Sequence, residues 1–365
     1  MIVITARNFL PDMGGIQILM ADIAKHLSGY TQVKVYADDK KNFDDFDKKQ
    51  KYEIERIKGF KFIRKFRKAN QIQDYIRRNK SISALISDHW KSLEKLSKNT
   101  CQSVKTICLI HGKEINHPIG SILNTRMINS LSKAQHIIAN SIFTKNLAIE
   151  KGLPKQKIVI INPGTDEAEK NLDENAALEI YGNSNPKIVT VCRLEKRKGL
   201  EQTLLALKNF EAKYQDFRYV IIGNGEERKN LENQVENLNL KKNIIFISDV
   251  SLKLKNSLIK IADFFVMPSI QVKKSVEGFG ISFLEAAKYG TPSIGGIVGG
   301  ASDIIKHKES GLLCDGEKHE EIYESLIKMM EKDNFKSMGQ YAKELSKKFL
   351  WDAQIKKYLD LIKIN

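Results

Sequence analysis

Short apolar runs alternate along the chain with longer segments in which apolar residues recur at helical spacing. In the first half, the apolar runs typical of buried strands are residues 1–6, 32–37, 84–87, 104–110, 136–140 and 157–162. Amphipathic segments typical of helices lie between them, notably at 15–28, 61–78 and 141–151. Strands that alternate with helices in this way predict βαβ units on a parallel sheet.

The second half repeats this architecture without repeating the sequence. Its strand-like runs are 187–193, 218–223, 243–247 and 264–268, and its helical patterns are 199–214, 226–239, 252–261 and 281–289. The 365 residues are too many for one hydrophobic core. We therefore predict an α/β protein with two Rossmann-like domains, at 1–166 and 187–348. A polar linker at 167–186 joins them, and a final helix occupies 349–365. Ligands bind beyond the carboxyl ends of parallel strands, so two such sheets facing each other define a cleft.

The composition is that of an ordinary soluble protein except for its charge, which is +16. Much of the excess lies between Lys48 and Lys80, where thirteen Lys or Arg residues stand against three acids. Apolar residues recur there at helical spacing, namely Phe62, Ile63, Phe66, Ala69, Ile72 and Ile76. The plain interpretation is a helix whose apolar side packs on the sheet. Its basic side can still attract an anionic membrane surface, at about 1 kcal/mol per charge. Nucleic acid is disfavoured because aromatic residues do not interleave with the charges.

Other compositional features bound the location of the protein. No run approaches the roughly 20 apolar residues that cross a bilayer, and the first residues read as a strand rather than a secretory signal. The four cysteines are scattered and form no CxxC pair. We therefore expect a cytoplasmic protein without disulfides or a structural metal, with peripheral attachment to the inner face of the membrane left open.

Glycine turns follow several of the predicted strands. They are Gly14-Gly15, Gly223-Asn224-Gly225 and Gly299-Gly300. Glycine lets a phosphate approach backbone N–H groups at the start of a helix, although tight turns explain such glycines equally well. The chain contains neither a complete GxGxxG fingerprint nor a Walker A sequence.

Two charged segments are more specific. Arg193 and Lys198 follow an apolar strand and precede a helix, where they can neutralise a diphosphate; the alternative is a solvated basic loop. Glu277 stands before Gly278 and Gly280, at the expected start of another helix. Glu285 lies inside that helix, so the two carboxylates would reach different parts of one extended ligand.

This last segment resembles the EX7E signature of retaining glycosyltransferases with the GT-B fold, specifically glycosyltransferase family 4. The resemblance extends over nearly the entire chain. It includes Gly14-Gly15, His111 to Glu114, Ala139-Asn140-Ser141, Asn162 to Asp166, Arg193 with Lys198, Gly223 to Glu226, Pro268-Ser269, Glu277 with Glu285, Gly299-Gly300, Ser310 to Leu313 and Trp351-Asp352.

The resemblance implies a role for each matching position. The first domain would lie on the acceptor side, and the second would bind the nucleotide sugar. The implied catalytic residues are Glu277, His111, Arg193 and Lys198. The implied donor-binding residues are Gly15, Arg193, Lys198, Gly223, Gly225, Glu277, Gly278, Phe279, Gly280, Ile281 and Glu285. Among them Glu277 would contact the sugar and Glu285 the ribose, and Glu114 is the candidate acceptor-binding residue. The last helix would cross back to the first domain.

The resemblance also implies a reaction that retains the anomeric configuration, with the leaving phosphate helping to deprotonate the acceptor. It implies no bound metal and no cofactor. The DxD string at Asp45-Phe46-Asp47 lies in a charged run, so we interpret it as a solvated loop. Asp303, Ser248-Asp249-Val250 and Pro163 to Asp166 depart from the usual family pattern, which leaves the base and the sugar open.

The sequence thus predicts a retaining transferase that moves a sugar from a UDP- or GDP-linked donor to a glycan or lipid-linked glycan, in cell-surface polysaccharide biosynthesis. The alternatives are a sugar-nucleotide epimerase or phosphorylase on the same fold, or a non-catalytic basic binding module. Expected partners are the donor, the acceptor and, as an open option, an anionic membrane surface. The oligomeric state is not predicted.

Overall fold

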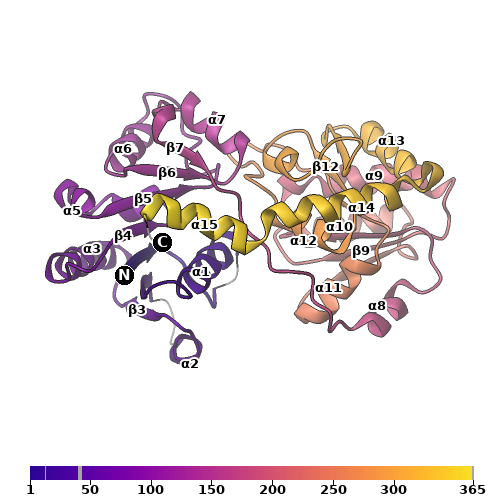
Figure 1. Ribbon diagram of the computed structural model, residues 1–365. Coiled ribbons are helices and arrows are strands. Elements are labelled where there is room, and N and C mark those ends of the chain that lie inside the picture. Colours follow the sequence, from indigo (N-terminus) through magenta and orange to yellow (C-terminus); the bar gives the residue numbers. More distant parts are fainter. Residues whose placement is uncertain (13, 40–42, 364–365) are drawn as a thin grey trace. The chain divides into compact units, whose positions relative to one another are not determined.

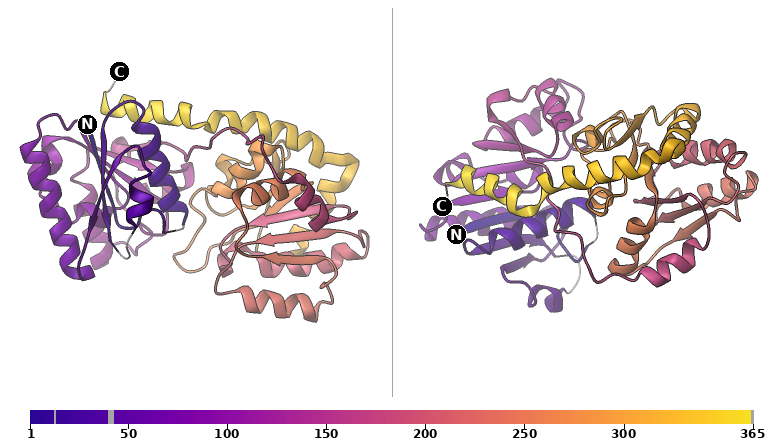
Figure 2. Two further views of the ribbon diagram at one scale, coloured as in Figure 1. Left: turned by 90° about the horizontal axis from the view of Figure 1, so that it is seen from below. Right: turned by 45° about the vertical axis from the view of Figure 1, so that its right-hand side comes forward.

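The computed structural model describes residues 1–12, 14–39 and 43–363 of the chain (Figure 1). The chain forms two compact units. Unit 1 comprises Met1–Gly164 together with Trp351–Asn365, and unit 2 comprises Thr165–Leu350. Each unit is a parallel sheet between helices, which the two further views in Figure 2 show as well. The predicted α/β architecture of two Rossmann-like domains is confirmed.

The described strands of unit 1 are all parallel, in the order β3-β2-β1-β4-β5-β6-β7. They are β1 (Ile2–Ala6), β2 (Val33–Asp38), β3 (Glu53–Ile57), β4 (Ala84–Ser87), β5 (Lys105–Ile110), β6 (His136–Ala139) and β7 (Ile158–Ile160). The α-helices are α1 (Gly15–Leu27), α2 (Asp44–Asp47), α3 (Lys61–Arg78), α4 (Trp90–Leu93), α5 (Lys98–Ser103), α6 (Ile122–Leu131), α7 (Ile142–Glu150) and α15 (Trp351–Ile362).

Side chains of β1 alternate between two cores. Ile2 and Ile4 pack in the core beneath α1 and α15, whereas Val3 packs in the core beneath α3 and α7. This alternation follows from the two-residue period of a strand, and both faces are buried because helices cover each of them. Helix α15 lies along α1 (Figure 1), where the Trp351 ring stacks on His26 with centroids 5.1 Å apart.

The described strands of unit 2 are also parallel, in the order β10-β9-β8-β11-β12-β13. They are β8 (Lys187–Val191), β9 (Arg218–Ile222), β10 (Ile244–Ile247), β11 (Phe264–Met267), β12 (Ser293–Gly296) and β13 (Gly311–Cys314). The α-helices are α8 (Glu174–Tyr181), α9 (Leu200–Glu211), α10 (Arg228–Asn237), α11 (Leu252–Ile261), α12 (Ile281–Tyr289), α13 (His319–Met330) and α14 (Asn334–Ser346). Helices α9, α10 and α13 bury one face of the sheet, and α8, α11 and α12 bury the other.

The stretch expected as a linker, 167–186, differs from that expectation. It contains α8, whose Ala177 and Tyr181 side chains are fully buried in the core of unit 2. The Tyr181 hydroxyl donates a hydrogen bond of 2.9 Å to the Leu258 carbonyl oxygen, which ties α8 to α11. A helix of eight residues with few core positions gives too weak a periodic pattern to stand out from a polar stretch.

The acidic string at 45–47 is not a solvated loop. It belongs to the short helix α2, and the Asp47 carboxylate receives two hydrogen bonds from the Arg56 guanidinium, of 2.6 and 2.9 Å. Arg56 follows in β3, so a bidentate ion pair fixes α2 against the edge strand.

Helix α3 confirms half of the prediction made for the basic segment. Ala69, Ile72 and Ile76 are buried against the sheet as expected. Phe62 and Phe66, in the N-terminal half of the helix, are instead exposed to solvent. The apolar pattern therefore continues one and a half turns beyond the part that the sheet covers. Among the residues that the structure describes, no helix is long and apolar enough to cross a bilayer.

Candidate active site

In unit 2, the loops that follow β8 and β9 pack backbone against backbone. A Cβ atom at Gly223 would overlap the carbonyl oxygen of Cys192, and one at Gly225 would overlap that of Leu194. Gly223 also has a φ of 143°, which side-chain-bearing residues rarely adopt. The structure therefore requires glycine at these two predicted donor-binding positions whether or not they bind a ligand. Both let the loop after β9 pack against the loop that carries Arg193.

The loop after β8 places a carboxylate between two cations. Lys198 Nζ forms an ion pair with Glu277 Oε2, and Arg197 Nη1 lies 2.8 Å from the same oxygen. Arg197 Nε also contacts Glu195 at 2.8 Å, and Arg193 Nη1 reaches Glu195 at 3.2 Å. Three predicted residues, Arg193, Lys198 and Glu277, therefore belong to one ion-pair network. Lys198 is buried, whereas the Arg193 side chain is 61% exposed and can turn toward a ligand.

The electrostatics of this network keep Glu277 ionised. Burial opposes the charged form of Glu277, but the Lys198 ammonium and the Arg197 guanidinium outweigh it. Together they lower the pKa of the carboxyl from 4.5 to about 2. Glu277 therefore accepts hydrogen bonds at neutral pH and cannot serve as a proton donor there.

The depressed pKa of Glu277 predicts a pH-dependent contribution to stability. The unfolded chain binds the proton more tightly than the folded chain, so the contribution is present above about pH 4.5 and is lost as the pH falls toward about 2. Melting curves of Glu277→Gln should therefore lie below those of the unaltered protein at neutral pH and converge with them in acid. The exposed Glu179→Gln serves as the control and should show no such difference; a constant gap at all pH values would contradict the assignment.

The backbone around Glu277 is anchored by the turn at residues 299–300. The Gly300 N–H donates to the Glu277 carbonyl oxygen at 2.9 Å, and a Cβ at Gly300 would overlap the Gly278 carbonyl oxygen. Gly280 is the left-handed N-cap residue of α12, so Ile281 is the first residue of that helix. The N–H groups of the first helical turn have no partner within a helix and attract anions. Phe279, just before this helix, is buried in the core of unit 2.

Glu285 lies one turn into α12 and is held separately. Its Oε1 atom lies 2.7 Å from Lys255 Nζ of the neighbouring helix α11. The two glutamates of the signature are thus each paired with lysine, Glu277 with Lys198 and Glu285 with Lys255. The cations contact one oxygen of each carboxylate, Oε2 of Glu277 and Oε1 of Glu285, and an ionised carboxylate has further lone pairs that can accept hydrogen bonds from hydroxyl groups of a ligand.

In unit 1, His111 directly follows β5 and is buried. Its Nε2 lies 2.8 Å from the carbonyl oxygen of Asp88, an arrangement in which Nε2 carries the proton and donates it. The His111 N–H donates to Glu114 Oε1 at 2.5 Å, and the Trp90 indole donates to the Glu114 carbonyl oxygen at 2.9 Å. Glu114, the candidate acceptor-binding residue, therefore closes the turn that carries His111. Gly15 is exposed as the first residue of α1.

Sequence reasoning missed two residues of these arrangements. Arg197 stands between Lys196 and Lys198, and a run of three cations gives no signal of which ones point inward. Asp88 is buried and receives hydrogen bonds from the Arg7 N–H at 2.8 Å and from Ser92 Oγ at 2.6 Å. Burial raises the pKa of this carboxyl. Its position directly after the apolar run of β4 was the signal that could have identified it.

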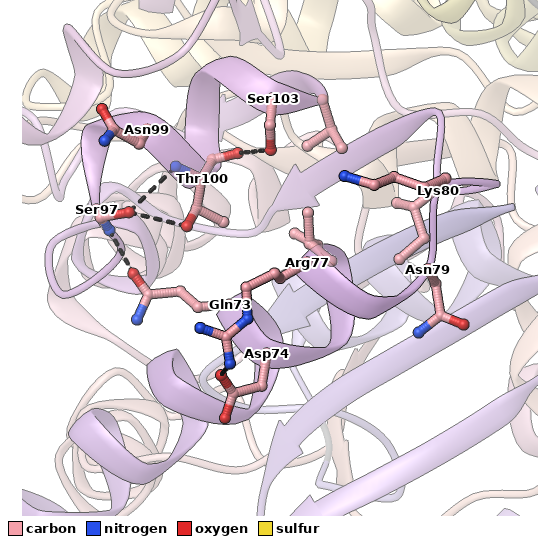
Figure 3. A pocket seen from close by; sticks show the side chains of 12 residues that line it. Gln73, Asp74, Arg77, Asn79, Lys80, Ser97, Asn99, Thr100 and Ser103 are labelled. Carbon is pink, nitrogen blue, oxygen red and sulfur yellow. Dashed lines mark hydrogen bonds and ion pairs between the residues drawn. The ribbon is translucent and has the colours of Figure 1, made fainter.

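A polar hollow in unit 1 lies away from these residues (Figure 3). Side chains from the end of α3, from α5 and from the residues that flank these helices line it, among them Arg77, Asn79, Ser97 and Thr100. The hollow lies where β4 and β5 begin, at the amino edge of the sheet, whereas the predicted residues of unit 1 follow strand ends at the carboxyl edge. None of the predicted site residues lines it.

Comparisons with known proteins cover almost the whole length of the chain. Residues 13–169 match the family described as Glycosyltransferase Family 4, and residues 173–345 match the family described as Glycosyl transferases group 1. One curated relative is the GDP-mannose-dependent alpha-(1-6)-phosphatidylinositol monomannoside mannosyltransferase of Mycobacterium tuberculosis. It is 22% identical, over 99% of this chain and 98% of the relative.

Solved structures show the same fold. HepE of Anabaena in complex with UDP superposes with a TM-score of 0.82 at 17% identity, over 99% of each chain. Sucrose-phosphate synthase of Thermosynechococcus elongatus superposes with a TM-score of 0.78 at 17% identity, over 99% of this chain and 98% of that one. The chain therefore belongs to the family 4 type of glycosyltransferases, built on the GT-B fold.

Proposed function

We propose that this glycosyltransferase takes a hexose from a UDP- or GDP-sugar and transfers it, with retention of configuration, to a glycan or lipid-linked glycan. The observation that carries the proposal is the partly buried network of Glu277 with Lys198 and Arg197 at the carboxyl edge of the sheet in unit 2. The names of the relatives support both a UDP-linked and a GDP-linked donor. The mycobacterial relative is GDP-mannose-dependent, and HepE was crystallised with UDP and with UDP-glucose. With such an acceptor, the enzyme would act in the synthesis of cell-surface polysaccharide or lipopolysaccharide, on the cytoplasmic side of the membrane.

The network suggests how the donor is held. The diphosphate takes Lys198 and Arg193 as its counterions, together with the N–H groups at the start of α12. Glu277 then loses Lys198 but keeps Arg197, so it stays ionised and accepts hydrogen bonds from hydroxyls of the sugar. Glu285 binds the ribose hydroxyls in the same way, beside Lys255. These cations take the charge of the diphosphate, and we propose that no metal ion is required.

We propose a transfer step that these contacts would support. The bond between the anomeric carbon and the phosphate oxygen breaks while the acceptor oxygen bonds to the same carbon from the same face. The proton of the acceptor hydroxyl passes to the leaving phosphate. Lys198 and Arg193 stabilise the negative charge that develops on that phosphate. Stabilisation of developing charge by fixed charges is usually the largest single contribution to catalysis.

A thermal-shift screen of UDP- and GDP-sugars, followed by a transfer assay with the best stabiliser, tests this function. A ligand at a hundredfold excess over its Kd stabilises the folded state by about 2.7 kcal/mol. We expect one nucleotide sugar to raise the melting temperature and Glu285→Gln to weaken that effect. The assay is run with and without EDTA and should give the same rate in both.

The product distinguishes the alternatives. An epimerase converts the donor without an acceptor, and a phosphorylase releases a sugar phosphate. A non-catalytic binding module would show no nucleotide-dependent shift, and its ligand binding would be indifferent to Glu277→Ala. If no nucleotide sugar stabilises the protein, the roles proposed for Lys198, Arg193 and Glu285 are wrong.

A further inference from the structure

Four apolar side chains project from unit 1 at the start of α3. Phe60 is 85% exposed, Phe62 70%, Ile63 53% and Phe66 41%. We call these four residues the Phe60 patch. Large aromatic side chains seldom stay in water without a partner surface, because each leaves a large apolar area in contact with water. All four residues lie within the seven-residue segment 60–66, so the patch is one local feature rather than a scatter of single exposed residues.

The patch is arranged together with cations. The rings of Phe62 and Phe66 pack with centroids 5.8 Å apart, and Lys65 Nζ lies 4.4 Å from the Phe62 centroid. Lys95, in the segment after α4, places its Nζ 4.8 Å from the Phe66 centroid. Lysine ammonium groups thus lie over the faces of both rings.

The basic residues in and beside the first half of α3 include two groups. Lys68 is buried and donates to the Ala6 carbonyl oxygen and to Asp38, each at 2.7 Å. Arg64 donates to the Asp39 carbonyl oxygen at 2.6 Å and pairs with Asp38 at 3.2 Å. These two cations fasten the helix to the ends of β1 and β2 and are not available to a partner.

The other group lies around the patch and keeps its charge unneutralised. Lys65, Lys95 and Arg67 form no ion pair with any carboxylate among residues 1–12, 14–39 and 43–363. The Arg67 guanidinium donates a hydrogen bond of 3.0 Å to the Lys58 carbonyl oxygen. An apolar projection is thus surrounded by positive charge.

We propose that the Phe60 patch inserts into the interfacial region of an anionic lipid bilayer, with Lys58, Lys65, Arg67 and Lys95 on the headgroups. Aromatic rings partition into that region, and each cation near an anionic leaflet adds attraction that salt screens. A second copy of the chain fits less well, because a two-fold contact would bring these cations against their own counterparts. The inference goes beyond the proposed function, since binding to lipid requires no nucleotide sugar.

Sedimentation with vesicles of phosphatidylglycerol and phosphatidylcholine in equal parts tests this surface. We expect the protein to pellet with these vesicles at low salt and not with phosphatidylcholine alone. The double variant Phe62→Ser/Phe66→Ser should lower the partition coefficient about tenfold or more. The matched control is Tyr30→Ser, which removes an aromatic ring that is 51% exposed elsewhere in unit 1 and should change nothing. Both variants should keep the melting temperature and the nucleotide-dependent shift, which separates this proposal from the proposed function.

Two further measurements distinguish insertion from general charge attraction. Phe62→Trp introduces a fluorophore that brominated lipid should quench, whereas the native Trp90 and Trp351 are buried and should report little. Lys65→Glu should weaken binding more than Arg78→Glu, which makes the same charge change at the other end of α3.

The proposal is overturned if the protein fails to pellet with anionic vesicles, if the double serine variant binds as tightly as the unaltered protein, or if both charge variants weaken binding equally. Loss of a dimer in light scattering on the double serine variant would also overturn it, in favour of self-association.

Discussion

Replacing Lys198 with methionine is expected to lower kcat/KM for sugar transfer by about a thousandfold, because a fixed cation at a developing phosphate charge contributes that much. In the protein without ligand, Lys198 is the buried partner of Glu277. Methionine keeps much of the shape of the lysine side chain and removes only its charge. Steady-state kinetics with the donor identified by the thermal-shift screen measure the effect.

The control for this variant lies two residues earlier. Lys196 is exposed on the same loop, so Lys196→Met makes the same chemical change outside the network and should leave the kinetics unaltered. Arg197 still pairs with Glu277 when Lys198 is lost, so the fold should survive and a melting curve verifies this. Equal losses in both variants would mean that the loop acts through its total charge, and full activity of Lys198→Met would remove Lys198 from the mechanism.

Gly223→Ala is expected to lower the free energy of unfolding by about 3 kcal/mol or more, since it combines an unfavourable backbone conformation with a steric overlap. The added methyl group would overlap the Cys192 carbonyl oxygen and push apart the loops after β8 and β9. Urea unfolding followed by far-UV circular dichroism measures the loss. Because the Arg193 loop would move as well, donor binding should weaken in whatever protein still folds.

A second glycine of unit 2 separates the two contributions. Gly290 is left-handed at the end of α12, with a φ of 82°, but a Cβ there would come no closer than 3.6 Å to other atoms. Gly290→Ala should therefore lower the free energy of unfolding by only about 1 kcal/mol, which is the cost of placing alanine in a left-handed backbone conformation. Similar losses at Gly223 and Gly290 would show that the backbone contact between the two loops contributes little.

The ends of helix α12 were predictable because glycine marks both of them. Helix α12 occupies 281–289 as predicted, between Gly280 and Gly290, both left-handed. Helix α3 also has its predicted bounds, from 61 to 78. Strands β12 and β13 were not among the predicted strands, because each has only four residues and contains glycine, so neither gives a clear apolar run.

The site was predictable as a set of residues but not as a set of contacts. Arg193, Lys198 and Glu277 were chosen from the sequence, and the structure brings them into one network. The sequence did not reveal that Arg197 bridges Glu195 and Glu277, since side-chain direction within a basic run depends on the fold around it. The Phe60 patch was missed for the same reason, because a helical stripe does not tell where the sheet beneath it ends.

Helix α15 places a constraint on how the protein forms on the ribosome. Unit 2 is one continuous segment, Thr165–Leu350, whereas the core of unit 1 contains Trp351, Tyr358 and Leu359 from a helix made after unit 2. During synthesis unit 2 is complete before α15 can join α1 over one face of the unit 1 sheet. Unit 1 is therefore the last to mature, and the part of its core that α15 covers is the apolar surface that a chaperone would meet on the nascent chain.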